Sequence, residues 1–171
     1  MADDTRPNVI LTGFMGTGKT TIAPLLAERL GYTWVDTDLV IEHRHGPIST
    51  IFAEHGEAVF RGYERTVAQE LARTGGQVIS TGGRLMLDAA NAAMLGGSGR
   101  VFCLTADVPT ILERTRAQVG DRPLLTGPDA IDRITRLLAE RREGYARFDE
   151  VSTVDRSPDD VVDDLMRRID G

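Results

Sequence analysis

Cysteine and long apolar runs are both scarce in this chain of 171 residues. The single cysteine, Cys103, excludes an internal disulfide. No stretch approaches the roughly 18 apolar residues of a membrane-spanning helix. The opening MADDTRPN has acids and a proline where a secretory signal would have a basic start and an apolar segment. We therefore expect a cytoplasmic protein, in a reducing compartment, without a membrane partner.

Positive charge is also in deficit, because the formal net charge is −6 and the pI is near 5.1. A protein whose main partner is nucleic acid or an anionic membrane needs a basic face, so we expect neither partner. Any anionic ligand must meet a local positive site. The length suits a single compact domain over residues 1–171.

Lysine is rarer still, and its one occurrence lies in a motif. Lys19 is the only lysine among the 20 basic residues, and it stands in GFMGTGKT, from Gly13 to Thr20. This stretch fits GxxxxGK[ST] and separates an apolar strand-like run from a helical one, which is the context of a phosphate-binding loop. A glycine turn that merely caps the helix is the alternative.

The phosphate-binding interpretation gives each residue type a physical reason. Glycines let backbone N–H groups wrap a phosphate, and the helix start adds the positive end of its dipole. Lys19 supplies a compact charge between the β- and γ-phosphates, where a broad guanidinium would fit poorly, and the hydroxyl of Thr20 would ligate Mg²⁺. The residues expected to bind the nucleotide here are Gly16, Thr17, Gly18, Lys19, Thr20 and Thr21.

Short apolar runs alternate with longer segments of helical period, which predicts a parallel sheet with helices on both faces. The expected strands are Asn8 to Thr12, Thr33 to Asp36, Gln77 to Ser80, Arg100 to Leu104 and Val151 to Asp155. Ser157, followed by Pro158 and two acids, predicts the start of a last helix over 158–169. Residues 117–129 lack periodicity and are rich in glycine and proline, so we expect a mobile lid there.

Two acids, Asp36 and Asp38, follow the second expected strand. If the chain is extended there, both carboxylates lie on one side, at the edge of the sheet where doubly wound folds bind ligands. One carboxylate could hold a metal-bound water while the other accepts a hydroxyl proton. Alternatively, Asp38 is only the N-cap of the next helix.

Arg61 and Glu64 stand three apart in GEAVFRGYE, a segment of helical period, and therefore share one helix face. Glu64 can hold the guanidinium of Arg61 in place, and an arginine so oriented suits a carboxylate ligand. A simple surface ion pair is the alternative.

The scarcity of lysine also narrows the function. A guanine-nucleotide switch needs an NKxD base-recognition motif, which cannot exist when Lys19 is the only lysine. Three classes remain open: an ATP-dependent kinase of a small molecule, a regulatory ATPase, and a nucleotide-binding protein that has lost its chemistry.

The order of GxxGxGKTT, DTD, GExxFRxxE, TGG, RPLL and a late RxxxY resembles the shikimate kinase family over nearly the whole chain. The resemblance implies a three-layer α/β P-loop fold with a five-stranded parallel sheet and a mobile lid, like that of the nucleoside monophosphate kinases. It also implies transfer of phosphate from ATP, with Mg²⁺, to the 3-hydroxyl of shikimate, and we expect a monomer.

The resemblance also assigns roles. Asp38 resembles the residue that binds the substrate hydroxyls and acts as base, and Asp36 resembles a residue near Mg²⁺. Arg122 resembles the lid arginine that reaches the γ-phosphate, and Arg114 and Arg156 resemble contacts of the nucleotide base. The remaining residues implied in substrate binding are Arg61, Gly82, Gly83 and Arg141.

One departure from the family pattern concerns the glycines after the third expected strand. The family has a glycine triplet, whereas this chain reads Gly82, Gly83, Arg84. A glycine could adopt positive φ and bring its N–H close to the acceptor, which an arginine does less readily. We expect the Arg84 side chain to point to solvent, with entry into the pocket as the alternative.

The chemistry assigned to Lys19 predicts that Lys19→Arg loses phosphoryl transfer although it keeps the charge. The expected loss is on the order of 10²-fold in kcat, the size typical of one charge-stabilising contact. Steady-state kinetics check this, and a variant that keeps more than about a tenth of the parent rate contradicts the assignment.

Overall fold

The computed structural model describes residues 5–117 and 127–171. Its strands form one parallel sheet in the order β2-β3-β1-β4-β5. The expected five-stranded α/β fold is therefore confirmed. The bounds of the strands are β1 Asn8–Thr12, β2 Thr33–Asp36, β3 Gln77–Ser80, β4 Gly99–Thr105 and β5 Asp149–Ser152.

The last strand lies earlier than predicted. β5 ends at Ser152 instead of reaching Asp155, and Asp155 is not extended, because its φ of +51° lies in the left-handed region. β5 is an edge strand, and only Val151 among its residues is buried. Its polar sequence consequently lacks the continuous apolar run that marks the inner strands.

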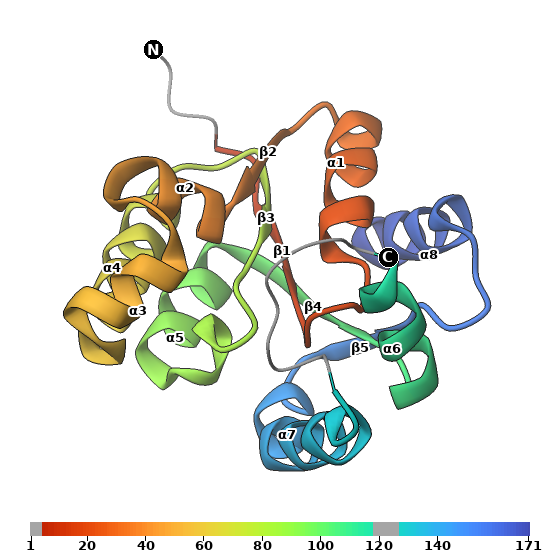
Figure 1. Cartoon of the computed structure of the whole chain (residues 1–171). Helices are drawn as coiled ribbons and strands as arrows, with labels where there is room; N and C mark the ends of the chain where they lie inside the picture. Colours follow the sequence, from red (N-terminus) through yellow and green to blue (C-terminus); the bar gives the residue numbers. More distant parts are fainter. Residues whose placement is uncertain (1–4, 118–126) are drawn as a thin grey trace.

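Helices cover both faces of the sheet (Figure 1). On one face lie α1 and α8, and on the other lie α4, α5 and α7. The smaller helices α2 and α3 pack beside α4. The bounds are α1 Lys19–Leu30, α2 Thr37–His45, α3 Ile48–His55, α4 Glu57–Leu71, η1 (a 3₁₀ turn) Leu85–Leu87, α5 Ala89–Ser98, α6 Val108–Arg116, α7 Ala130–Tyr145 and α8 Pro158–Asp170.

The alternation of side chains along β1 divides the core into two layers. Val9 and Leu11 pack with the residues of α1 and α8, whereas Ile10 packs with those of α4 and α5. All five residues of β1 are buried. A strand buried on both faces reads as an unbroken apolar run, which is why the inner strands could be located from the sequence.

Parallel pairing brings the carboxyl ends of β1, β2 and β3 to one edge of the sheet. The phosphate-binding loop follows β1, α2 follows β2, and Gly82 and Gly83 follow β3. Three segments that are distant in sequence thus meet where this fold class binds ligands. None of the helices within the described ranges combines the length and apolar character of a membrane span.

The expected start of the last helix is confirmed, because α8 begins with a capping box. The hydroxyl of Ser157 accepts from the N–H of Asp160 at 3.1 Å, and the Asp160 carboxylate accepts from the N–H of Ser157 at 3.4 Å. Both groups satisfy N–H donors that the helix itself leaves without partners.

We predict that Ser157→Ala lowers the free energy of unfolding by about 1 kcal/mol, the typical value of an N-cap. Urea unfolding at neutral pH checks this. Ser49→Ala, which removes an exposed hydroxyl from α3, is the matched control and should change stability by less than about 0.5 kcal/mol. Equal stability of the two variants would contradict the role of the cap.

Candidate active site

A cleft of about 830 Å³ lies at the carboxyl edge of the sheet. It collects every predicted site residue within the described ranges. These are Gly16, Thr17, Gly18, Lys19, Thr20, Thr21, Asp36, Asp38, Arg61, Gly82, Gly83, Arg114, Arg141 and Arg156. Arg122 and most of the segment 117–129 lie outside the described residues, so the prediction of a lid stays a prediction.

The phosphate-binding loop has the backbone that its glycines predict. Gly13 has a φ of +137°, and a Cβ there would come within 2.3 Å of the carbonyl oxygen of Leu104. Gly18, with a φ of +108°, is the N-cap of α1. The ammonium of Lys19 donates to the carbonyls of Gly13 at 2.6 Å and Phe14 at 2.9 Å, which holds the charge over the loop.

Arg114, predicted to contact the nucleotide base, stabilises the phosphate-binding loop by hydrogen bonds. Its guanidinium donates to the carbonyl of Gly16 at 3.1 Å and to the hydroxyl and carbonyl of Thr153, both at 2.8 Å. The Thr153 hydroxyl in turn donates to the carbonyl of Thr17 at 2.7 Å. Buried Thr153 was missed by the sequence analysis, since nothing in its local sequence marks it.

The expected extended geometry of the two acids is wrong. β2 ends at Asp36, and α2 begins at Thr37 with no intervening loop. Asp36 is the N-cap, because its Oδ1 accepts from the N–H of Leu39 at 3.0 Å, so the alternative that Asp38 caps the helix is also wrong. Asp38 lies instead in the first turn of α2, and both acids still line the cleft.

Asp38 is held in a desolvated position. Its Oδ1 is buried, and within the described part of the chain it accepts no hydrogen bond. Gly82 makes this position possible, since a Cβ there would come within 2.7 Å of Oδ1. Burial, with the nearby charges of Asp36 and Glu64, raises the pKa of Asp38 to about 6, although Lys19 acts in the opposite direction.

Arg61 is anchored as predicted. Its NH1 donates to Glu64 at 2.7 Å, and Glu64 is only 2% exposed, so this is not a simple surface pair. Burial raises the pKa of Glu64, and Arg61 works against that rise. Glu57 also accepts from Arg61, at 3.3 Å from Nε and 3.1 Å from NH2, and this second partner was missed.

Arg141 reaches the cleft from α7. Its guanidinium carbon lies 5.1 Å from the centroid of the Phe14 ring, within range of a cation–π contact. One turn later, the hydroxyl of buried Tyr145 donates to the carbonyl of Gly83 at 2.5 Å. The spacing RxxxY therefore joins α7 to the glycine pair and points Arg141 at it, since a Cβ on Gly83 would lie 3.2 Å from NH1.

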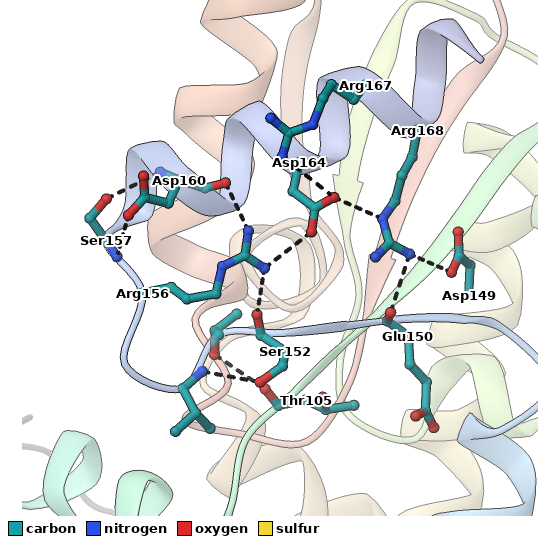
Figure 2. Close-up of polar contacts among 12 residues, drawn as sticks. Thr105, Asp149, Glu150, Ser152, Arg156, Ser157, Asp160, Asp164, Arg167 and Arg168 are labelled. Atoms are coloured by element: carbon teal, nitrogen blue, oxygen red, sulfur yellow. Dashed lines mark hydrogen bonds and ion pairs between the residues drawn. The ribbon is translucent and has the colours of Figure 1, made fainter.

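Arg156 lines the cleft, but its guanidinium is engaged with α8 (Figure 2). It donates to the carbonyls of Ser152 and Asp160, each at 3.0 Å, and to the carboxylate of Asp164 at 3.1 Å. Asp164 also accepts from Arg168 at 3.0 Å. In this arrangement Arg156 shapes the loop between β5 and α8.

The expected exposure of Arg84 to solvent is confirmed, although its side chain also borders the cleft. Arg84 lines the cleft with about half of its side chain exposed, and its NH1 donates to Glu57 at 3.2 Å. Its φ of −107° is ordinary for any residue. Gly82 and Gly83 also avoid positive φ, so glycine is favoured there by the close approach of Asp38 to residue 82 and, less strictly, of the Arg141 side chain to residue 83.

The oxygen atoms that could ligate a metal in the cleft fit Mg²⁺. Thr20 and Asp36 offer oxygen ligands to the same cleft, and both oxygens of Asp36 are oriented by donors, Leu39 N–H and the hydroxyl of Ser80 at 3.1 Å. Within the described residues no group of three or more His, Cys, Asp or Glu residues forms a cage. Mg²⁺ in phosphoryl-transfer sites is typically held by one or two protein oxygens together with phosphates and water.

Comparisons with known proteins agree on one family. A family model described as shikimate kinase matches residues 15–170. The shikimate kinases of Geobacter metallireducens and Symbiobacterium thermophilum are 40% and 42% identical to this chain; the alignments cover 96% and 95% of this chain and 92% and 95% of theirs.

Solved structures give the same result. A shikimate kinase from Acinetobacter baumannii in complex with shikimate has a TM-score of 0.88 and 34% identity, covering 96% of this chain and 93% of its own. A gluconokinase from Sinorhizobium meliloti, at 19% identity and a TM-score of 0.66 over 97% and 95% of the two chains, shares the fold.

The desolvation of Asp38 predicts a pH-dependent gain of stability in Asp38→Asn. Because the folded-state pKa of about 6 lies above the ordinary value of 3.8, ionised Asp38 destabilises the fold. The gain should be near zero below about pH 4, grow mainly between about pH 4 and 6, and level off at no more than about 3 kcal/mol above pH 7.

Urea unfolding of both proteins across this range checks the prediction. Asp159→Asn, which neutralises an exposed acid on α8 outside the cleft, is the control and should show no such rise. An Asp38→Asn protein with the same pH dependence as the parent would contradict the account.

Proposed function

Because this chain belongs to the shikimate kinase family, we propose that it transfers the γ-phosphoryl group of ATP to the 3-hydroxyl of shikimate, giving shikimate 3-phosphate and ADP. One observation carries the proposal. A phosphate-binding loop, a desolvated carboxylate and two arginines suited to a carboxylate ligand all face one cleft.

The nucleotide end of the cleft is the phosphate-binding loop. Backbone N–H groups of the loop and the start of α1 bind the phosphates, and Lys19 lies where it can follow the charge of the transferring group. Thr20 and Asp36 would hold Mg²⁺, Asp36 through water. When bound, the ion neutralises charge on the phosphate oxygens.

Asp38 supplies the base at the acceptor end. With a pKa of about 6 it is mostly ionised at neutral pH, and the carboxylate oxygen that is not buried against Gly82 can accept the proton of the substrate hydroxyl. As the hydroxyl oxygen forms its bond to the γ-phosphorus, the bond from that phosphorus to the β,γ-bridging oxygen breaks. ADP leaves with the bridging oxygen, and the hydroxyl proton remains on Asp38.

The acceptor carboxylate is bound by Arg61 and Arg141, which reach the cleft from α4 and α7. Paired guanidinium groups bind a carboxylate with charge-assisted hydrogen bonds and so orient the ring. Gly82 and Gly83 line the cleft beside Asp38 and Arg141, and the absence of side chains lets both of these residues lie close to the backbone at the acceptor end.

Arg114 and Arg156 flank the nucleotide end of the cleft and position the adenine base of ATP. They act largely by holding the phosphate-binding loop and the loop between β5 and α8 in place. We further propose that residues 1–171 act as one domain and as a monomer in the cytoplasm. The single domain and the monomer rest on a cleft in which one chain provides both the phosphate-binding loop and the acceptor groups.

The function is tested by measuring ADP release with MgATP and a panel of hydroxylated carboxylates that includes shikimate and gluconate. Shikimate should support turnover with the highest kcat/KM, and the product should carry phosphate on the 3-hydroxyl by NMR. Preferred turnover of another acid would replace the substrate and keep the reaction class, whereas no phosphoryl transfer at all would overturn both.

Arg61→Ala should raise the KM for shikimate on the order of 10²-fold with little effect on the KM for ATP, because it removes charge-assisted bonds to the acceptor alone. Arg65→Ala, one turn along α4 and paired with Asp88 outside the cleft, is the matched control and should leave both constants within about twofold. A rise confined to the KM for ATP would show that the acceptor site is wrongly assigned.

A further inference from the structure

Glu57 occupies one of the two edges through which Arg61 can bind a carboxylate with paired hydrogen bonds. Its Oε1 accepts from Nε at 3.3 Å and from NH2 at 3.1 Å, the two N–H groups that form one edge of the guanidinium. The third nitrogen, NH1, is held by Glu64 at 2.7 Å. A substrate carboxylate that binds the Nε–NH2 edge must therefore displace Glu57.

The same oxygen of Glu57 has a second cation beside it. NH1 of Arg84 donates to Oε1 at 3.2 Å, so one carboxylate oxygen is shared between Arg61 and Arg84. Glu57 is 54% exposed and can move, whereas Glu64 is 2% exposed and cannot readily leave. Of the two acids on Arg61, Glu57 is thus the one that can be exchanged.

We propose that Arg84 is a positioning residue. When the acceptor carboxylate binds Arg61 and displaces Glu57, Glu57 keeps its ion pair with Arg84 alone. The exchange replaces one partner of Arg61 by another of the same charge and leaves Glu57 paired with Arg84. Without Arg84, Glu57 stays on Arg61 and competes with the substrate. Arg84 then acts on the acceptor through Glu57 and Arg61.

No other role in the structure accounts for Arg84. Its backbone is ordinary, with a φ of −107°, and its side chain is 53% exposed. The pair with Glu57 is the one hydrogen-bonded ion pair assigned to Arg84 within the described chain. Arg84 also lines both the main cleft and a smaller pocket of about 480 Å³, as does Arg141, so the space around its side chain is open.

The inference rests on the proposed function, and a double-mutant cycle of Arg84→Gln and Glu57→Gln tests it. Calorimetry gives the Kd for shikimate, and steady-state kinetics give kcat and both KM values. Arg84→Gln should raise the Kd and KM for shikimate about three- to fivefold, the size of one half-exposed ion pair, with kcat and the KM for ATP unchanged. In the Glu57→Gln background the same change should have less than about 1.5-fold effect.

Two further variants sharpen the test. Arg84→Lys keeps the charge and should restore most of the affinity. Arg65→Gln removes another α4 arginine that pairs with Asp88 and should leave the Kd for shikimate unchanged.

An equal loss in both backgrounds would mean that Arg84 contacts the acceptor directly, and no loss in either would mean that it is merely solvated. Both results overturn the exchange. The parent's turnover with MgATP tests the function separately. Shikimate that binds with the expected coupling but is not phosphorylated would overturn the function alone, and shikimate that does not bind would overturn both.

Discussion

The contact between the carboxylate of Asp38 and the backbone of Gly82 is the constraint on which the cleft depends. It requires β2 and β3 to end side by side, α2 to begin without a loop, and residue 82 to lack a side chain. Burial at this contact raises the pKa of Asp38 to about 6, which suits the role of base that we propose for it near neutral pH. Fold, electrostatics and proposed chemistry thus share one contact.

The cleft carries a local concentration of positive side chains, although the protein as a whole is negatively charged. A chain with a net charge of −6 gathers Lys19 and several arginines around one cavity, where anionic phosphates and a carboxylate are to bind. Most of these cations already have partners, such as the carbonyls under Lys19 and the two glutamates on Arg61. Such partners fix the geometry in advance, so ligand binding requires less reorganisation.

The fold and most of the cleft could be predicted because their signals are local. Inner strands are buried on both faces and read as apolar runs, and the phosphate-binding loop is one continuous motif. β5 was misplaced because an edge strand with one buried residue carries no such run. The contact of Arg84 with Glu57 joins residues 27 positions apart, and the hydrogen bond of Thr153 to Thr17 joins the segment after β5 to the phosphate-binding loop; neither leaves a pattern in the sequence.

The central claim, that the fold holds Asp38 as a desolvated base, is tested most directly by its own titration. Carbon-13 NMR of aspartate-labelled protein follows each carboxyl carbon with pH, and the signal absent from Asp38→Asn assigns the residue. The account predicts a midpoint near 6. A midpoint at or below the ordinary value of 3.8 would contradict it, because a carboxylate with that pKa is solvated or fully hydrogen-bonded and is a poor base near neutral pH.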